Sequence, residues 1–529
     1  MIVLDPSKVS TNCQRKVMAN LQKVVAAVEL PAASCQPGNV PGAADVRLNR
    51  NSSASVPLLV DLDQSLIKTD MLHETALAFV SAHPFRVATL IAWAAKGRAQ
   101  LKKNLALSAE LDANLIPINE DVAAIAAQAK NEGRPVYLVT ASDETLAAKI
   151  ANRLGYFDGI ICSNGVVNLK GRNKLAVIRE RFPEGFDYIG DSAADLHIWR
   201  SAREVIAVAP GRGTRRKVQS LAKPTTIIPR QKTRLSALIK AGRLHQWAKN
   251  ALIFVPAILS GTIADPHTVL ACVLSFVALG LVATGTYLIN DLFDIASDRR
   301  HWSKRSRPIA SGDLPISVAI LAGAVSIGAG LAVGTVVGAG VVSGLAAYLV
   351  LTLAYSFQIK RIPILDVVVL AALFTLRLAI GIVAAQVFAS PWLLVFSMFL
   401  FTSLSVAKRY TEIQRTIEKG GSSVPGRGYV IADSPLVLGI GLATGTASIL
   451  ILVLYLIFDA FSHSFYGNSN WLWSFPVILF LWISRIWLLS QRGELDDDPV
   501  AFALKDQQSL LLGGILMTGF LLAWIGIPL

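Results

Sequence analysis

The stretch YLINDLFDIASDRRHWSKRSRPIASGDLP, residues 287–315, follows one long apolar run and precedes another. Asp291, Asp294 and Asp298 recur in it at positions i, i+3 and i+7, and a group of Lys and Arg residues follows at once. A helical end would place the three carboxylates on one face, where they repel one another unless a cation neutralises them. Mg²⁺ is the cation that we expect here, because it binds a few carboxylates together with the oxygens of a diphosphate. The stretch therefore predicts a metal-dependent phosphate site at a membrane boundary, and an ordinary solvated loop explains it less well.

The rest of the carboxyl-terminal half holds apolar runs that are long enough, or nearly so, to cross a hydrocarbon core of about 30 Å. There are nine of them, at approximately 250–264, 267–289, 315–334, 335–354, 363–385, 391–407, 435–458, 471–490 and 509–528. The third and fourth meet through Gly-rich sequence, where small residues permit close helix packing. We expect an all-α membrane domain of nine transmembrane helices over residues 231–529.

The loops between these runs predict the orientation of the chain. Loops on one side are rich in Lys and Arg, whereas the opposite loops and the C-terminus contain neither. By the positive-inside rule the basic loops and the amino-terminal half lie in the cytoplasm, and the C-terminus lies outside. The sequence therefore predicts a multi-pass protein of the inner (cytoplasmic) membrane.

The composition separates the chain into two unlike halves. Hydrophobic residues make up 53% of the 529 residues and charged residues only 16%, yet the formal net charge is +14. Residues 1–249 hold 34 basic and 21 acidic side chains, against 16 and 15 in residues 250–529. A single soluble domain and a small secreted scaffold are excluded. The four cysteines show no paired spacing, so neither a disulfide framework nor a zinc site is indicated (Cys13, Cys35, Cys162 and Cys272).

The amino-terminal half alternates strand-like and helical segments after a lead-in over residues 1–50 that we expect to be poorly ordered. Short apolar runs end in polar residues or Gly in PLLVDLD (57–63), VYLVTAS (136–142), FDGIICSNG (157–165) and FDYIGDSAADL (186–196). That rhythm is typical of a parallel α/β sheet, with functional side chains at the carboxyl ends of the strands. We expect a Rossmann-like domain over residues 51–230, with an inserted helical segment at about 70–115. The N-terminus lacks the apolar core of a secretory signal, which predicts a cytoplasmic location for this half.

Carboxylates stand at two of these strand ends. Asp61 and Asp63 flank one residue after the first strand, and Asp191 and Asp195 follow Gly190 in GDSAAD. Two carboxylates at one strand end suit a nucleophile and a general acid/base, with Mg²⁺ between them and a phosphate.

Together with Thr140 and Lys174, which follow in the correct order, these residues resemble the four motifs of the haloacid dehalogenase-like phosphatases. The resemblance implies that Asp61 is the nucleophile that becomes phosphorylated, and that Asp63 donates and accepts the proton. It implies Thr140 and Lys174 as phosphate-binding residues, and Asp61, Asp63, Asp191 and Asp195 as the Mg²⁺ site. Ser65 stands where the family more often has Thr or Val. The helical insert at 70–115 sits where small cap domains occur in this family.

The NDxxDxxxD run together with RPIASG resembles the UbiA superfamily of intramembrane prenyltransferases, over roughly residues 240–529. The resemblance implies nine transmembrane helices and Mg²⁺ on Asp291, Asp294 and Asp298, with Asn290 orienting the cluster. Quinone-type members carry a second Asp-rich motif, but here the corresponding loop YSFQIKRIPILD (355–366) has Asp366 as its only carboxylate. Asp366 and Arg377 are three helical turns apart, so we expect them to share a helix face. Arg485 is also intramembrane, and its partner is not evident from the sequence.

One acidic site opposed by cations fits two anionic substrates better than a neutral aromatic acceptor. RLHQWAKNALIFVP (243–256), HWSKRSRPIASG (301–312), YSFQIKRIPILD and VAKRYTE (406–412) look like the polyprenyl-phosphate phosphoribosyltransferase branch of that superfamily. Phosphoribosyl diphosphate and polyprenyl phosphate are then the implied substrates. The candidate phosphate-binding residues of this half, not divided between the two substrates, are Lys304, Arg305, Arg307, Tyr355, Lys360, Arg361, Arg377, Lys408 and Arg409.

The two halves together predict a bifunctional enzyme of cell envelope biosynthesis. The membrane half would transfer 5-phosphoribose to the lipid phosphate, and the soluble half would remove the 5-phosphate to give polyprenyl-phosphoryl-ribose, a precursor of arabinose-donor lipids. Both active sites would face the cytoplasm. The net positive charge suits phosphorylated substrates and an anionic leaflet rather than nucleic acid, and a homo-oligomer stays compatible with the sequence. Two other readings stay open: an aromatic prenyltransferase whose phosphatase half acts on a separate small molecule, and a transporter or anchor with a soluble regulatory module.

Overall fold

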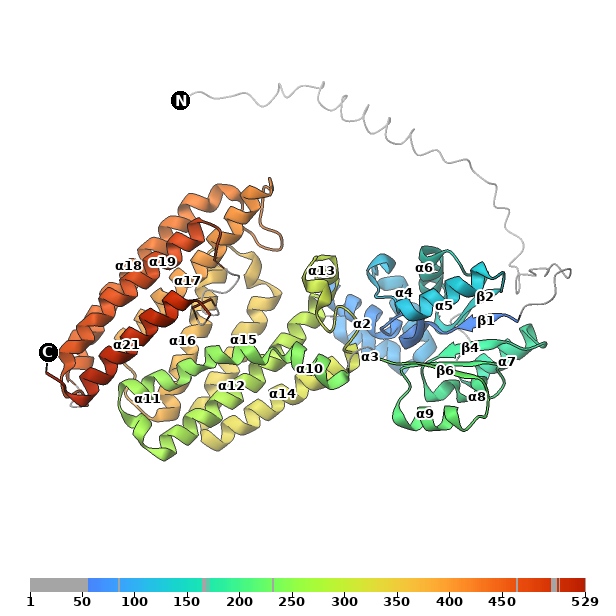
Figure 1. The fold of residues 1–529 in the computed structure, drawn as a ribbon, viewed down its shortest axis with the longest axis horizontal. Coiled ribbons are helices and arrows are strands. Elements are labelled where there is room, and N and C mark those ends of the chain that lie inside the picture. The colour runs from blue at the N-terminus through green and yellow to red at the C-terminus, as the bar shows by residue number, and fades with distance from the viewer. Residues whose placement is uncertain are drawn as a thin grey trace, which may run out of the picture. The chain divides into compact units, whose positions relative to one another are not determined.

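The structure is a computed structural model that describes residues 56–529 apart from 84–85, 164–168, 170, 231–232, 463–464, 496–501, 504 and 529. The predicted lead-in over residues 1–50, with Cys13 and Cys35, lies outside the described residues. Residues Ser55–Leu529 form one compact unit. Within it an α/β domain precedes a set of long helices (Figure 1), as the composition predicts.

The α/β domain is built on a six-stranded sheet in which every neighbouring pair is parallel. The strands are β1 (Leu58–Val60), β2 (Val136–Asp143), β3 (Gly159–Ser163), β4 (Asp187–Gly190), β5 (Val205–Val208) and β6 (Thr225–Ile228). Their order is β3-β2-β1-β4-β5-β6. Strands β2 and β3 lie on one side of β1, and β4, β5 and β6 lie on the other side. The direction in which strands are added therefore reverses between β3 and β4. This reversal opens a crevice at the carboxyl ends of β1 and β4, where ligands bind in such sheets.

Both faces of the sheet are covered by helices, which is why its strands read as continuous apolar runs. Leu58 and Val60 point into a core formed with α5 (Glu120–Asn131) and α6 (Glu144–Leu154). Leu59 points into a second core formed with three helices on the opposite face, α7 (Arg172–Arg181), α8 (Leu196–Trp199) and α9 (Arg212–Gln219). The period-two alternation of β1 thus fixes which residue faces which layer.

The insert predicted at about 70–115 is confirmed as helical. It contains α2 (Met71–Ala82), α3 (Val87–Ala95) and α4 (Arg98–Ser108), followed by the short turn η4 (Ala113–Leu115). The Asp70 side chain accepts hydrogen bonds from the backbone N–H groups of Leu72 and His73, so it caps α2.

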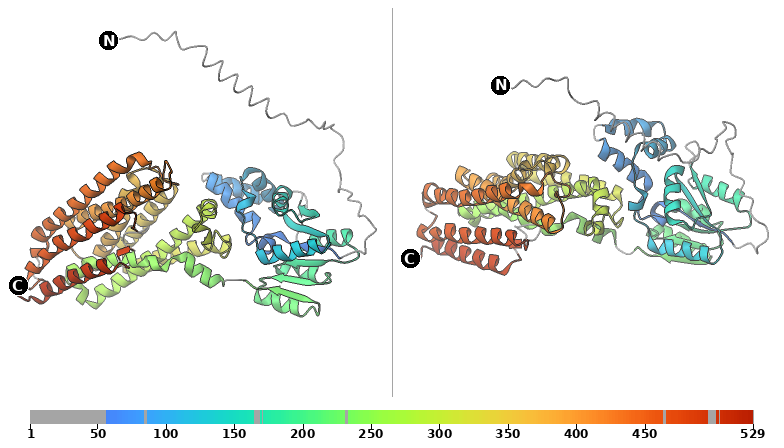
Figure 2. Two further views of the ribbon diagram at one scale, coloured as in Figure 1. Left: turned by 45° about the horizontal axis from the view of Figure 1, so that its top comes forward. Right: turned by 90° about the horizontal axis from the view of Figure 1, so that it is seen from above.

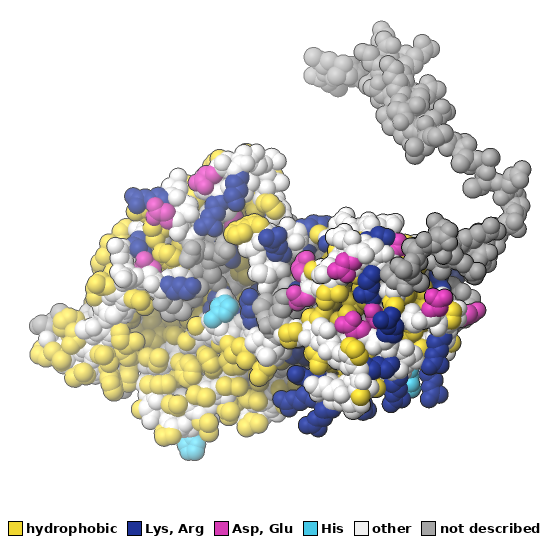
Figure 3. All heavy atoms as spheres, turned by 45° about the vertical axis from the view of Figure 1, so that its right-hand side comes forward, with side chains coloured by type: hydrophobic (Ala, Val, Ile, Leu, Met, Phe, Trp, Pro, Cys, Tyr) yellow, Lys and Arg dark blue, Asp and Glu magenta, His cyan; other side chains and the backbone are white. Residues whose placement is uncertain are grey.

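Eight helical segments within the described residues are long and apolar enough to cross a membrane. They are Pro266–Phe293 (α12), Ile316–Val337 (α14), Ala339–Phe357 (α15), Leu365–Ala385 (α16), Pro391–Glu418 (α17), Ile431–Phe458 (with α18, Ser434–Phe458), Ser469–Gln491 (with α19, Ser474–Gln491) and Gln507–Ile525 (α21). They run alongside one another (Figures 1 and 2), and large apolar side chains such as Leu321, Val336 and Val350 stay exposed on them. Figure 3 shows a broad hydrophobic area on this half, which suits contact with lipid tails.

The Gly-rich join between the third and fourth predicted spans is a real break. Helix α14 ends at Val337, and Gly338 follows with a φ of 150° before α15 begins. Glycine tolerates this backbone conformation because it has no Cβ.

The first predicted span, 250–264, is not one long α-helix. A 3₁₀ helix, η6 (Leu244–Phe254), leads into the short α11 (Val255–Leu259) and then η7 (Thr262–Ala264). Pro256 has no N–H to donate to the preceding turn, so a regular α-helix cannot run through this point. The segment is packed tightly all the same: a Cβ on Gly280 of α12 would lie 2.6 Å from Trp247, and one on Gly381 of α16 would lie 2.2 Å from the Ile253 carbonyl oxygen.

Candidate functional sites

The crevice of the α/β sheet holds a compact group of carboxylates. Asp61 follows β1, Asp191 follows β4, and Asp195 closes the turn η5 (Ala193–Asp195). One oxygen atom of each side chain lies within 4.8 Å of the others. Three carboxylate oxygens at such spacing can hold a hard divalent cation. Three of the four predicted metal ligands are therefore brought together by the fold.

A single buried lysine faces these carboxylates. Lys174 projects from α7, and its Nζ donates to Asp61 Oδ1 at 2.6 Å, to the Tyr188 hydroxyl at 3.0 Å and to the Val139 carbonyl at 3.1 Å. Tyr188 in turn donates to Asp195 Oδ1 at 3.1 Å. Tyr188 escaped the sequence analysis because it points inward from an apolar strand and resembles a core residue. The group keeps more negative than positive charge.

Burial and the excess negative charge together raise the pKa values of these carboxyls. Burial, with the charge of Asp195 added, raises the pKa of Asp61 to about 7 although Lys174 lowers it. Burial and the charges of Asp61 and Asp195 raise the pKa of Asp191 to about 8. A divalent cation would relieve the same repulsion, so this donor set fits a metal ion.

Asp63 lies beside the group and is held by two donors. Its Oδ1 accepts from the Met71 N–H at 2.8 Å, and its Oδ2 accepts from the Ser142 hydroxyl at 2.7 Å. Burial and the charge of Asp70 raise its pKa, which favours the protonated form that a general acid needs. Thr140 is fully buried at the end of the apolar part of β2, and its Oγ1 accepts from the Ser142 N–H at 3.0 Å. Ser142 therefore links two predicted site residues and was not itself predicted.

The aspartates of the membrane half are arranged differently from the sequence prediction. Helix α12 ends at Phe293, Asp294 caps it, and α13 (Ile295–Arg300) starts in a new direction. The expectation of one continuous helix face is therefore wrong, because the chain breaks between Asp291 and Asp298. These two carboxylates are still joined, since Arg307 Nη1 donates to Asp291 Oδ1 at 3.1 Å and to Asp298 Oδ2 at 2.7 Å.

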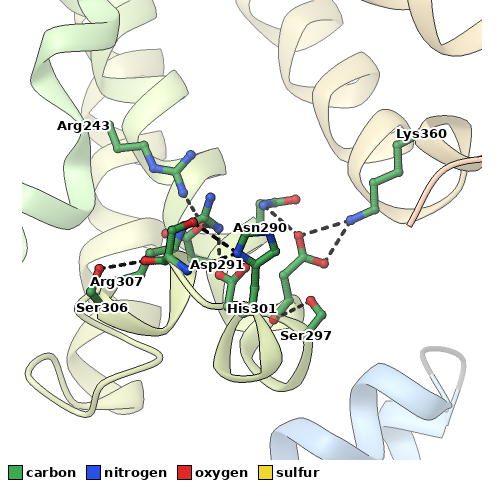
Figure 4. A network of polar contacts seen from close by, with 11 residues as sticks. Arg243, Asn290, Asp291, Ser297, His301, Ser306, Arg307 and Lys360 are labelled. Atoms are coloured by element: carbon green, nitrogen blue, oxygen red, sulfur yellow. Dashed lines mark hydrogen bonds and ion pairs between the residues drawn. The ribbon is translucent and has the colours of Figure 1, made fainter. Parts of the chain in front are cut away.

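Asp294 has a separate environment. Lys360 Nζ lies 2.9 Å and 3.2 Å from its two oxygens, and Asn290 Nδ2 donates to Oδ2 at 3.1 Å. Figure 4 shows Lys360 approaching from the loop after α15 while Arg243 and Arg307 approach Asp291 from the other side. Among the described residues, oxygens of the three membrane aspartates do not all lie within 4.8 Å of one another, whereas those of the α/β crevice do. Each is instead paired with a cation.

Arg243 was not among the predicted residues, although it also contacts Asp291. It precedes η6, and its guanidinium lies 5.3 Å from the centre of the Tyr287 ring. In the sequence Arg243 is only the first residue of RLHQWAKN, and that position does not reveal that the segment folds back along α12.

The two most deeply buried arginines of the membrane half have protein partners. Arg409 Nε donates to Asp366 Oδ2 at 2.6 Å, and Arg409 also binds Glu412 at 2.8 Å and the Tyr355 hydroxyl at 3.0 Å. Asp366 of α16 thus pairs with Arg409 of α17.

The other buried arginine, Arg377, has only uncharged partners among the described residues. Its Nε donates to Asn250 Oδ1 at 3.2 Å, and its Nη2 donates to the Tyr348 hydroxyl at 3.2 Å. The guanidinium also lies 5.0 Å from the centre of the Phe374 ring, a distance at which the ring face attracts a cation. It therefore pins η6 against α15 and α16.

The remaining predicted cations lie nearer the surface. Lys304, Arg305 and Arg361 are exposed, and Lys408 is half-buried. Arg485 has a partner that the sequence did not reveal: its Nη atoms lie 2.7 Å and 2.9 Å from the oxygens of Asp506, which caps α21.

A buried ion pair joins the helical insert of the α/β domain to α13. Arg299 Nη1 and Nη2 donate to the two Glu74 oxygens at 3.0 Å and 2.7 Å, and Thr69 Oγ1 donates to Glu74 at 2.7 Å. Leu77 of α2 packs with Leu288 and Leu292 of α12 in one core. Arg299 directly follows Asp298, so the membrane aspartates are braced by the α/β domain.

The comparison with family models matches residues 251–525 to the UbiA prenyltransferase family. This match spans more than half of the chain. The chain belongs to the UbiA prenyltransferase family. Together with the eight apolar helices, membership makes it a multi-pass membrane protein.

Relatives extend the comparison beyond the membrane half. An uncharacterised protein, y4nM, of Sinorhizobium fredii is 41% identical over 470 residues, which is 88% of this chain and 91% of that protein. Because the match is far longer than the membrane half, it includes much of the α/β domain. The nodulation protein NoeC of Azorhizobium caulinodans is 32% identical over 51% of this chain and 88% of its own. A decaprenyl-phosphate phosphoribosyltransferase of Mycobacterium tuberculosis is 29% identical over 55% of this chain and 92% of its own.

Proposed function

We propose that the membrane half transfers 5-phosphoribose from phosphoribosyl diphosphate to a polyprenyl phosphate, and that the α/β domain then removes the 5-phosphate. The observation that carries the proposal is the presence of two separate carboxylate groups, each faced by cations, in one chain. The similarity to decaprenyl-phosphate phosphoribosyltransferases supports the first step. The order of Asp61, Thr140, Lys174 and Asp191 around the crevice supports a haloacid dehalogenase-like phosphatase for the second.

The transfer step needs little acid/base chemistry. An oxygen of the lipid phosphate attacks the anomeric carbon of the ribose, and the bond from that carbon to the diphosphate oxygen breaks. Mg²⁺, when bound by Asp291, Asp294 and Asp298, would supply positive charge at the leaving diphosphate. Arg307, Arg243 and Lys360 already neutralise these carboxylates and can turn toward phosphate oxygens when substrate enters. Diphosphate is released and a phosphodiester to ribose remains.

The second step removes the remaining phosphomonoester. An oxygen of Asp61 attacks phosphorus, and Asp63 gives its proton to the departing 5-oxygen of the ribose. Water then attacks the phosphorylated Asp61, with Asp63 as the base, and inorganic phosphate is released. Lys174 holds Asp61 in place and neutralises phosphate charge, and Mg²⁺ on Asp61, Asp191 and Asp195 would add to that neutralisation. The product is polyprenyl-phosphoryl-ribose.

We also propose nine crossings of the inner membrane, with both sites on the cytoplasmic side and the C-terminus outside. The segment η6–α11 runs antiparallel to α12, since Trp247 Nε1 donates to Thr284 Oγ1 near one end and the centre of the Phe254 ring lies 6.1 Å from that of the Phe276 ring toward the other. At about 2.0 Å per residue for a 3₁₀ helix and about 1.5 Å for an α-helix, η6 and α11 together extend about 30 Å. The 3₁₀ form thus lets a short segment reach across the bilayer.

A donor assay tests the proposal. The full chain in lipid nanodiscs with Mg²⁺ is given polyprenyl phosphate and either phosphoribosyl diphosphate or a prenyl diphosphate with an aromatic acceptor. We expect turnover with phosphoribosyl diphosphate and a dephosphorylated lipid product by mass spectrometry. Asp61→Asn should accumulate the phosphorylated lipid. Turnover with the prenyl diphosphate alone would replace the proposal with an aromatic prenyltransferase, and fully dephosphorylated product from Asp61→Asn would refute the phosphatase assignment.

A further inference from the structure

A cavity opens directly beside the carboxylates of the α/β domain. It has a volume of about 260 Å³, and Asp191 forms part of its wall. Asp191 belongs to the group with Asp61 and Asp195, so a ligand in the cavity reaches the edge of the phosphatase site. Gln64 and Ala209 also form the wall, and both are non-glycine residues with positive φ, 59° and 42°. Such strained backbone persists where the surrounding structure enforces it, and it is common at ligand sites.

Two arginines in the wall have no role in the phosphatase chemistry itself. Arg230 is half-buried after β6 (Thr225–Ile228), and Arg234 begins α10 (Arg234–Gly242). Within the described part of the chain, neither side chain forms an ion pair or a hydrogen bond. Burial and the charge of Arg234 lower the pKa of Arg230, while Asp313 and Asp191 act in the opposite direction. Two neighbouring cations that repel each other in the wall of a cavity create a site for an anion.

The acidic side chains that line the cavity, Asp70 and Asp191, are engaged elsewhere. The Asp70 side chain caps α2 through the Leu72 and His73 amides, and His73 Nδ1 lies 3.6 Å from Asp70. Asp191 faces the other carboxylates of the phosphatase group. The cavity therefore combines an acidic end, suited to a metal and a phosphate, with a basic side that can take a second anionic group.

The opposite wall comes from the membrane half. Pro315, Ile316, Ser317 and Val318 line the cavity, and Ile316 begins the membrane-spanning helix α14. A ligand in the cavity thus touches the start of a helix that is long and apolar enough to cross a membrane. Such a position suits a substrate whose polar head enters the cavity while its hydrocarbon chain stays in the bilayer.

We propose that Arg230 and Arg234 bind the phosphodiester group of a lipid-linked phosphomonoester and so select that substrate for the phosphatase site. The terminal phosphate then lies at Asp61 and Asp191, and the lipid leaves past the start of α14. This inference rests on the proposed dephosphorylation of the transferase product. Arg230 and Arg234 would distinguish that lipid from a small sugar phosphate. Both compounds carry the terminal phosphate, but the sugar phosphate has no phosphodiester group for the two arginines to bind.

Three substrates test the assignment in the full chain in nanodiscs. They are polyprenyl-phosphoryl-5-phosphoribose, a short-chain analogue with a methyl group in place of the lipid, and ribose 5-phosphate. For Arg230→Gln/Arg234→Gln we expect kcat/KM to fall about 10- to 100-fold on the first two, because hydrogen bonds between charged groups are lost. Hydrolysis of ribose 5-phosphate should not change. Arg230→Lys/Arg234→Lys should restore part of the loss by keeping the charge.

The control is Arg215→Gln/Arg216→Gln, which removes the same charge from exposed positions on α9 outside the cavity. It should leave all three substrates unaffected. An equal loss on ribose 5-phosphate, or no loss on either phosphodiester, would overturn the role of the two arginines. If the wild-type chain leaves the lipid substrate intact, the proposed phosphatase step itself is wrong and the arginine assignment falls with it.

Discussion

The two carboxylate groups of this chain differ in how their charge is balanced. In the α/β crevice, Asp61, Asp191 and Asp195 share one lysine, Lys174, and the oxygens crowd within 4.8 Å. In the membrane half, Asp291, Asp294 and Asp298 are held apart and matched by Arg243, Arg307 and Lys360.

The difference follows from the surroundings of each group. The crevice group borders a cavity through Asp191, and burial together with the repulsion between its carboxylates raises the pKa values of Asp61 and Asp191. Beside a bilayer, uncompensated charge is far more costly. A group there needs built-in cations.

The largest expected effect is the separation of the two activities. Asp191→Asn should lower dephosphorylation about 1,000-fold while transfer continues, and Asp291→Asn should do the reverse, because each removes a carboxylate from one group only. Transfer is measured by diphosphate release, and dephosphorylation by phosphate release from supplied phosphorylated lipid. Each variant is the folding control for the other. Loss of both activities in either variant would contradict the division into two sites.

The next effect concerns the ion pair that braces the membrane aspartates. Glu74→Gln leaves Arg299 buried without a full counter-charge, which should destabilise the contact between α2 and α13 by about 3–5 kcal/mol. Hydrogen exchange of the α2 and α13 amides measures the loss, with Glu132→Gln at an exposed position as the control. Unchanged exchange at both helices would show that the pair does not hold the two halves together.

Arg307 tests whether built-in cations matter for transfer. Arg307→Gln removes the side chain that joins Asp291 to Asp298, and we expect transfer to fall about 10- to 100-fold through lost charged hydrogen bonds. The matched control, Arg300→Gln, removes an exposed charge from the end of α13. Equal rates for the two variants would mean that the pairing is incidental.

The smallest effect is expected for an exposed pair. Lys130 and Asp158 form an ion pair on the α/β domain with side chains 41% and 31% exposed. Lys130→Ala should change the free energy of unfolding by less than about 1 kcal/mol, because water screens such pairs. A larger loss in a denaturant titration would mean that burial does not explain the contrast between the two carboxylate groups.

Local sequence features predicted much of the fold. Alternating apolar runs located four of the six strands, and the carboxylates after β1 and β4 were expected at one edge because parallel strands end together. Eight of the nine apolar runs correspond to long helices. The first run does not, because Pro256 interrupts the helical hydrogen bonding. The residues before it form η6, which packs closely against Gly280 and Gly381.

The pairing of charges was predicted less well. Helical spacing predicted that Asp366 and Arg377 share a helix face and gave no partner for Arg485, whereas the structure pairs Asp366 with Arg409 and Arg485 with Asp506. In both pairs the two residues belong to different helical segments, so the periodicity of one segment cannot predict which residue of another segment forms the ion pair.

The sequence alone identifies the segments that are long and apolar enough to cross a membrane and most of the strand ends, and it predicts candidate phosphate-binding residues, since hydrophobic runs and carboxylate spacing are local properties. Which cation meets which carboxylate depends on the tertiary structure. Arg299 and Glu74 are 225 residues apart, and Arg409 and Asp366 are 43 apart. Such partners are selected because folding removes them from water together, and that requires the packing of the whole chain.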